Sequence, residues 1–170
     1  MMQIRTNYDI PFASEQIAEF ISEFIDLNTI ILCIGSDKVK GDSLAPLVGT
    51  LLSQERYPLK IYGKLGDTVN ALNLENSLEE ITSAHPHSNI VAVDACLALD
   101  IGDIIARDYP LSPGAALNKP LPQVGTACIL GATMVDSINH EIDSSVLYKM
   151  AEVIVKALQI SYKKAKERIQ

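Results

Sequence analysis

TIILCIGSDKVKGDSLAPLVG, residues 29–49, places a continuous apolar run directly before a glycine-rich turn and a helical pattern. The run 29–35 is rich in isoleucine and too short for an ordinary helix, which is typical of a strand buried on both faces. From Leu44 to Leu52 the apolar residues recur at helical spacing. The stretch therefore predicts a buried strand that turns sharply into a helix, the repeating unit of a parallel α/β sheet.

The same alternation runs through the rest of the chain. We expect helices at 14–27 and 72–84 and from Asp143 or Ser144 onward, and strands at 59–63, 89–94 and 126–136, with 101–111 a strand or an extended segment. Such alternation specifies an α/β fold, a three-layer sandwich with a mostly parallel central sheet. The length of 170 residues and the 48% hydrophobic content suit a single α/β domain over 1–170.

The charge balance and the apolar pattern limit the classes of partner that we expect the protein to bind. Lys plus Arg number 14 and Asp plus Glu 21, a net charge of −7, whereas nucleic-acid binding needs a basic surface. No run approaches the roughly 18 apolar residues of a membrane helix, and the first residues lack a signal-peptide pattern. We therefore expect a cytoplasmic protein that binds no nucleic acid and no membrane. The basic stretch 161–170 is expected to be a solvated helix end.

The three cysteines, Cys33, Cys96 and Cys128, are widely spaced and flanked by apolar residues. Their number is odd, and they form no CxxC pair. This pattern indicates buried free thiols, as in proteins of a reducing compartment.

Two aspartates follow predicted strands. Asp42 comes a short turn after the first strand, and Asp94 closes the strand 89–94. Because sites in open α/β sheets form at the carboxyl ends of the strands, neighbouring strands would bring both carboxylates into one crevice. Two close carboxylates do not both ionise easily, so the pair would share a proton. That arrangement suits activation of water and protonation of a leaving group.

Each aspartate also has a purely structural interpretation. Asp94 would serve as a cap for the segment that follows it. If Ser43 is the N-cap, Pro46 falls in the tolerated first turn of the helix, and Asp42 lies just outside the helix N-terminus, where the dipole favours a carboxylate. The sequence leaves both interpretations open.

Other common chemistries have no motif in the sequence. The turn 35–43 lacks the GK[ST] end of a phosphate-binding loop and the GxGxxG spacing of a dinucleotide fold. There is no GxSxG elbow, and no cysteine has a plausible histidine partner. The segment 110–125 holds four prolines and two glycines and is expected to be a long, ordered and functional loop.

Three ordered blocks carry a resemblance to known proteins: GSDKVKGDSLAPLVG (35–49), VAVDACL (91–97) and SPGAALNK (112–119). Over most of the chain they resemble the YyaC-type sporulation proteins of spore-forming bacteria. More distantly they resemble the spore germination protease, an aspartate-dependent endopeptidase. The resemblance implies a phosphorylase/hydrolase-like fold of the germination-protease type.

Carried over residue by residue, the resemblance implies that Asp42 and Asp94 are the catalytic aspartates and that the substrate is a protein or peptide. We expect substrate-binding residues around them at Gly35, Ser36, Gly41, Ser43, Pro113, Gly114 and Asn118. Hydrogenase maturation proteases resemble this chain too, but their later histidine ligand has no counterpart between His87 and His140. We therefore expect no metal ion and no cofactor.

The hypothesis is thus a sporulation-associated, peptidase-like hydrolase in which Asp42 and Asp94 activate water. The alternative is a catalytically silent member of the fold that acts as a binding or scaffold protein in spore development. A metal-dependent maturation protease is a third and weaker hypothesis. The sequence leaves open the substrate and whether the protein forms a homo-oligomer.

Overall fold

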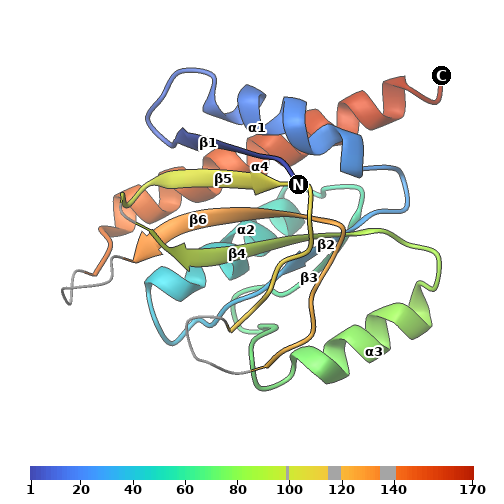
Figure 1. The fold of residues 1–170 in the computed structure, drawn as a ribbon, viewed down its shortest axis with the longest axis horizontal. Coiled ribbons are helices and arrows are strands. Elements are labelled where there is room, and N and C mark those ends of the chain that lie inside the picture. The colour runs from blue at the N-terminus through green and yellow to red at the C-terminus, as the bar shows by residue number, and fades with distance from the viewer. Residues whose placement is uncertain (99, 115–119, 135–140) are drawn as a thin grey trace.

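The computed structural model describes residues 1–98, 100–114, 120–134 and 141–170. Figure 1 shows its elements in chain order. They are β1 (Gln3–Asn7), α1 (Ala13–Ile21), the 3₁₀ turn η1 (Ser22–Phe24), β2 (Ile30–Cys33), the 3₁₀ turn η2 (Gly41–Ser43), α2 (Leu44–Gln54), β3 (Lys60–Tyr62), α3 (Leu74–Ala84), β4 (Ile90–Leu97), β5 (Asp103–Arg107), β6 (Ala127–Met134) and α4 (Ser144–Glu167).

Within the described residues the strands form one six-stranded sheet in the order β1-β5-β6-β4-β2-β3. The neighbours among β3, β2, β4 and β6 pair in parallel. The strand β5 runs antiparallel to both β6 and β1. The predicted mixed α/β architecture with a mostly parallel sheet is therefore confirmed, and β4 and β6 lie at its centre (Figure 1).

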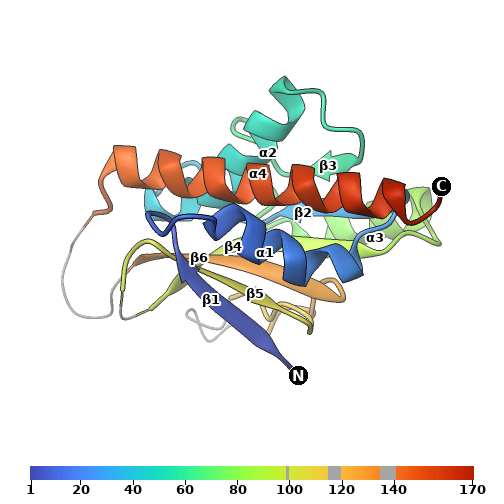
Figure 2. The same cartoon turned by 90° about the horizontal axis from the view of Figure 1, so that it is seen from above.

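Successive residues of the central strands contribute to two separate apolar cores. Ile31 and Cys33 of β2 pack with α1, α2 and α4, whereas Ile30 and Leu32 pack with Leu74 of α3 and its neighbours. This alternation is what a strand buried on both faces requires. Figure 2 shows α2 and α4 on one side of β4, β5 and β6. The sheet thus lies between helices that flank it.

The start of the chain differs from the expectation. Residues 3–7 form β1, a strand that the sequence pattern did not predict and that pairs antiparallel with β5. The helix expected over 14–27 ends at Ile21 and continues as the 3₁₀ turn η1. Both features depend on residues far away in the sequence.

The end of the chain holds the turn after α1 in place. Arg168 donates hydrogen bonds to the carbonyl oxygens of Ser22 at 2.7 Å and Ile25 at 2.9 Å. Carbonyls at a helix end lack intrahelical partners, so a guanidinium satisfies them well. The expectation that the basic stretch 161–170 is only a solvated helix end is therefore wrong for Arg168.

Gly63 after β3 lies against the backbone at the end of β2. It has φ +83°, and a Cβ on it would lie 1.9 Å from the carbonyl oxygen of Cys33. Gly66 has a similar φ of +80°, but nothing lies within 4 Å of the corresponding Cβ position. Comparing alanine substitutions at these two glycines separates the energetic cost of the positive φ from that of a steric clash.

We predict that Gly63→Ala lowers the free energy of unfolding by roughly 3 kcal/mol or more, because strain and a backbone clash combine. Gly66→Ala should cost only about 1–2 kcal/mol, the price of the left-handed conformation alone. Urea denaturation of the two variants and the parent protein measures both changes. Equal losses in the two variants would contradict the close packing of β3 against β2.

Candidate active site

Asp42 lies in η2, the short turn that precedes α2. The backbone N–H of Ser36 donates to the carbonyl oxygen of Asp42 at 3.2 Å and closes the turn. A Cβ on Gly35 would lie 2.2 Å from that same oxygen. Because only glycine permits this approach, the sequence pattern Gly-Ser at the end of β2 fixes the position of Asp42.

Gly41 anchors the other side of this turn. It is buried, and a Cβ on it would lie 3.1 Å from the hydroxyl oxygen of Thr133 and 3.2 Å from the side chain of Met134. The turn η2 therefore rests against the carboxyl end of β6, and it also contacts β4. The chain after β2 is thus brought over the two central strands.

The two serines of the turn have their partners within it. The hydroxyl of Ser36 accepts the backbone N–H of Lys38 at 3.2 Å, and the hydroxyl of Ser43 donates to the carbonyl oxygen of Lys40 at 2.6 Å. Ser43 is the N-cap residue of α2, as predicted, but its side chain makes no capping hydrogen bond. The predicted role of the Ser43 hydroxyl as a helix cap is therefore wrong.

Asp94 lies inside β4 rather than at its end. The strand continues to Leu97, and Asp94 pairs with Leu130 of β6. Its carboxylate accepts the backbone N–H of Ala95 at 2.8 Å. The prediction that Asp94 closes its strand is wrong, because pairing with β6 extends the strand by three more residues. The interpretation of Asp94 as the cap of a following segment fails for the same reason.

Burial dominates the electrostatics of both aspartates. Burial raises the pKa of Asp94 to about 8, the Ala95 N–H lowers it, and the charge of Asp42 raises it further. Burial also raises the pKa of Asp42, while the backbone amide of Ser36 lowers it. Asp94 is therefore largely protonated at neutral pH, and Asp42 is close enough to influence it. This asymmetry is the one expected of an acid and base pair.

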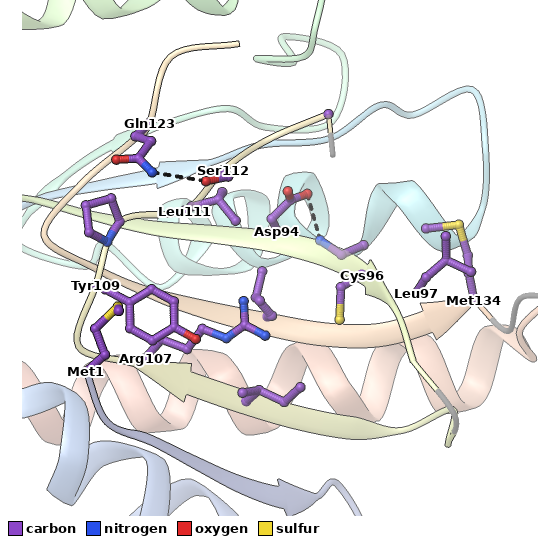
Figure 3. A pocket seen from close by; sticks show the side chains of 15 residues that line it. Met1, Asp94, Cys96, Leu97, Arg107, Tyr109, Leu111, Ser112, Gln123 and Met134 are labelled. Carbon is purple, nitrogen blue, oxygen red and sulfur yellow. Dashed lines mark hydrogen bonds between the residues drawn. The ribbon is translucent and has the colours of Figure 1, made fainter. Parts of the chain in front are cut away.

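A pocket of about 770 Å³ adjoins Asp94. Its walls come from β4, β5 and β6, from residues 109–112 and Gly114, and from Gln123. Figure 3 shows Asp94 on one side of this pocket and Arg107 and Tyr109 on the other, with Ser112 and Gln123 joined by a hydrogen bond of 3.4 Å. The two core leucines Leu111 and Leu130 make part of its lining apolar.

The remaining predicted residues divide between the turn and the pocket. Gly114, with φ +71°, lines the same pocket as Asp94. Pro113 beside it is buried and is not one of the pocket residues. Asn118 lies outside the described residues. Asp42 is held in the turn η2 rather than in the pocket wall, and this turn contacts β4, the strand that carries Asp94.

Sequence reasoning missed Arg107 and Tyr109. Arg107 ends β5, and its guanidinium carbon lies 5.4 Å from the centre of the Tyr109 ring. In a strand, residues 103, 105 and 107 share one face, so an assigned strand over DIIAR would have placed Arg107 beside Ile105. Cys96 also differs from the expectation: all three cysteines are free, but this one is partly exposed and lines the pocket.

Within the described residues, no three side chains of His, Cys, Asp or Glu come together in a way that would hold an ion. None of the described helices is long and apolar enough to cross a bilayer. What the arrangement offers chemically is a pair of unequal carboxyl groups next to a pocket.

Comparison with known proteins places these residues in a family. The model of the family described as protein of unknown function DUF1256 matches residues 5–157, which include both aspartates and Arg107. The chain belongs to this family.

A curated relative, the uncharacterized protein YyaC of Bacillus subtilis (strain 168), is 34% identical over 140 residues, covering 78% of this chain and 68% of YyaC. A bifunctional protein of tRNA 5-methylaminomethyl-2-thiouridine biosynthesis, MnmC of Shewanella halifaxensis (strain HAW-EB4), is 26% identical over 107 residues, covering 61% of this chain. The match spans only 17% of MnmC. No solved structure matches the chain significantly.

Asp94 should make the stability of the protein depend on pH. Its pKa is higher in the folded state, at about 8, than the value near 4 of an unfolded aspartate. Between these values the folded state holds a proton that the unfolded state has lost, so stability falls as pH rises. The loss is at most about 1.4 kcal/mol for each pH unit.

We predict that the Asp94→Asn variant does not show this loss. The free energy of unfolding of the variant, relative to that of the parent protein, should therefore increase from pH 5 to pH 8. Guanidinium denaturation at several pH values measures the difference. Asp9→Asn, at an exposed position, is the matched control and should leave the pH dependence of the parent protein intact. A parent protein as stable at pH 8 as at pH 5 would contradict the burial of a protonated Asp94.

Thr133 is a buried polar residue beside the turn. Its side-chain hydroxyl has no hydrogen-bond partner among the described residues, and the residue is 1% exposed. Thr29 is equally buried at 1%, but its hydroxyl accepts the backbone N–H of Asp26 at 2.8 Å and donates to the Asp26 carboxylate at 3.0 Å. The two threonines differ mainly in whether the hydroxyl is satisfied.

We predict that Thr133→Val leaves the free energy of unfolding unchanged or raises it by about 1 kcal/mol, because an unpaired hydroxyl is replaced by a methyl group. Thr29→Val should lower it by about 1–3 kcal/mol, because paired groups lose their partner. Thermal and urea unfolding of both variants provide the measurement. A clear loss in Thr133→Val would mean that the hydroxyl holds an ordered water.

Proposed function

We propose that this protein is a sporulation-associated, peptidase-like hydrolase in which Asp42 and Asp94 activate water for cleavage of a peptide bond. The observation that carries the proposal is the position of Asp94, which lines the pocket on β4, the strand that η2 with Asp42 contacts. Burial there raises the pKa of Asp94 to about 8, and the charge of Asp42 raises it further. A carboxylic acid that stays protonated at pH 7 beside a second carboxyl group is the arrangement that acid and base catalysis uses.

In the proposed reaction, ionised Asp42 takes a proton from a water molecule as the water oxygen attacks the peptide carbonyl carbon. Protonated Asp94 first donates a hydrogen bond to the carbonyl oxygen. It then transfers its proton to the leaving nitrogen as the carbon–nitrogen bond breaks. The products are a carboxylic acid and an amine, and the pair is left with its single proton on Asp42. Return of that proton to Asp94 restores the starting state.

The resemblance to the germination protease supports this assignment. The blocks GDSLAP and VDA, which carry Asp42 and Asp94, are similar to the segments that hold that enzyme's aspartates. The mixed sheet with flanking helices is compatible with a fold of the germination-protease type. The resemblance to YyaC-type sporulation proteins is the basis for the proposed association with sporulation, and the free cysteines favour a cytoplasmic location.

A catalytically silent binding protein is the second candidate function. The observation that favours it is the pocket of about 770 Å³, which is large enough for a ligand whether or not a bond is broken. In that case Asp94 would serve as a neutral hydrogen-bonding group in the pocket wall. The two functions differ in whether a substrate is consumed.

We predict that the purified protein cleaves peptides from a defined peptide library, and that Asp42→Asn and Asp94→Asn each lower kcat/KM by about 100-fold or more. Mass spectrometry of the products measures cleavage. Activity should fall as pH rises above about 8, because Asp94 then loses the proton that it donates.

Asp37→Asn is the matched control, since Asp37 lies in the same connection between β2 and α2 but is exposed. It should keep the parent activity. If no peptide is cleaved, and if both site variants still complement the absence of the protein in a sporulating host, the hydrolase proposal fails and the binding function stands.

A further inference from the structure

Arg107 carries a charge that the described part of the chain does not neutralise. Its Nε donates to the side-chain oxygen of Gln3 at 3.2 Å, and its guanidinium lies beside the Tyr109 ring. No carboxylate of the described residues forms an ion pair with it. Arg5, on the neighbouring strand, pairs with Asp100 and with Asp103. Of these two arginines, only Arg107 has a charge available for a ligand.

The charge of Arg107 faces into the pocket. Figure 3 shows its guanidinium extending from β5 toward the middle of the pocket. Burial raises the pKa of the Cys96 thiol on β4, and the charge of Arg107 is the first of the effects that lower it. Arg107 and Cys96 both line the pocket, from strands that are separated by β6.

The register of the sheet sets the separation between Arg107 and Asp94. Asp94 pairs with Leu130, which in turn pairs with Ile105, and Arg107 follows two residues later on the same face. Two strand spacings and two residues put the two backbone positions roughly 12 Å apart. The arginine side chain spans part of this gap. The remainder suits one or two residues of an extended peptide.

The surroundings strengthen an ionic contact at this position. Ile105, Leu111 and Leu130 line the pocket with apolar groups, and a low-dielectric wall increases the attraction between opposite charges. Protonated Asp94 would not repel an anion at neutral pH. The guanidinium presents paired N–H groups that match the two oxygens of a carboxylate.

We propose that Arg107 is a specificity-determining residue that binds a carboxylate of the peptide ligand in this pocket, one or two residues from the bond beside Asp94. The position of the bond rests on the proposed function, whereas the binding itself needs no turnover. The carboxylate comes either from an acidic side chain or from the C-terminus of the peptide. Both sources present the same group to Arg107.

Three blocked pentapeptides distinguish the sources. One has an internal glutamate and both ends blocked, one has a blocked amino end and a free C-terminal carboxylate, and one has an internal glutamine and both ends blocked. Titration calorimetry with Asp94→Asn protein measures their affinities without cleavage. We expect at least one carboxylate peptide to bind about tenfold more tightly than the glutamine peptide.

In the same Asp94→Asn background, Arg107→Gln should abolish this preference. Arg107→Lys should retain only part of it, because an ammonium keeps the charge but loses the paired geometry. Lys163→Gln, at an exposed position of α4, is the matched control. It removes the same charge from outside the pocket and should leave the preference unchanged.

Equal affinities for all three peptides, or a preference that survives Arg107→Gln, would overturn the inference. If Arg107→Gln does not fold, undiminished preference in Arg107→Lys would overturn it equally. A carboxylate preference without any cleavage by the parent protein would support the role of Arg107 and reject the proposed function. Cleavage without a carboxylate preference would support the proposed function and reject the role of Arg107.

Discussion

The parallel pairing of β4 with β6 is the constraint on which the rest of the molecule depends. It runs from Val91 to Leu97, and every other strand is positioned outward from this pair. Because Asp94 lies in the middle of the pairing, it is only partly exposed, and this burial raises its pKa. The chemistry of the site is thus a consequence of where the central strands overlap.

The turn after β2 is the second structural feature that positions the candidate site. Gly35 lets the Asp42 carbonyl approach the end of β2, and Gly41 rests against Thr133 of β6. Both contacts hold the turn over strands that the turn does not belong to. Holding two carboxyl groups in this region opposes folding at high pH, and the extensive apolar cores on both faces of the sheet offset that cost.

Local patterns predicted most of the fold, and they failed where a feature depends on distant partners. The buried strand β2 and the helix α2 follow directly from the apolar run and the helical spacing in residues 29–52. The strand β1 was missed because it is five residues long at the edge of the sheet and is stabilised by pairing with β5. The sequence predicted Asp94 as a site residue at a strand end, but its place inside the strand depends on the length of β6. The position of Arg107 in the pocket wall depends on the register of β5, which no local sequence pattern predicts.

The contact of Arg168 with the turn after α1 has a consequence for how the chain is made. Residues 144–167 cover one face of the sheet, and Arg168 reaches back across 146 positions to Ser22. During synthesis, the earlier strands and helices therefore leave the ribosome with that face exposed to solvent. The core on that face is complete only after α4 has emerged, so a nascent chain that lacks α4 exposes apolar surface and is prone to aggregate.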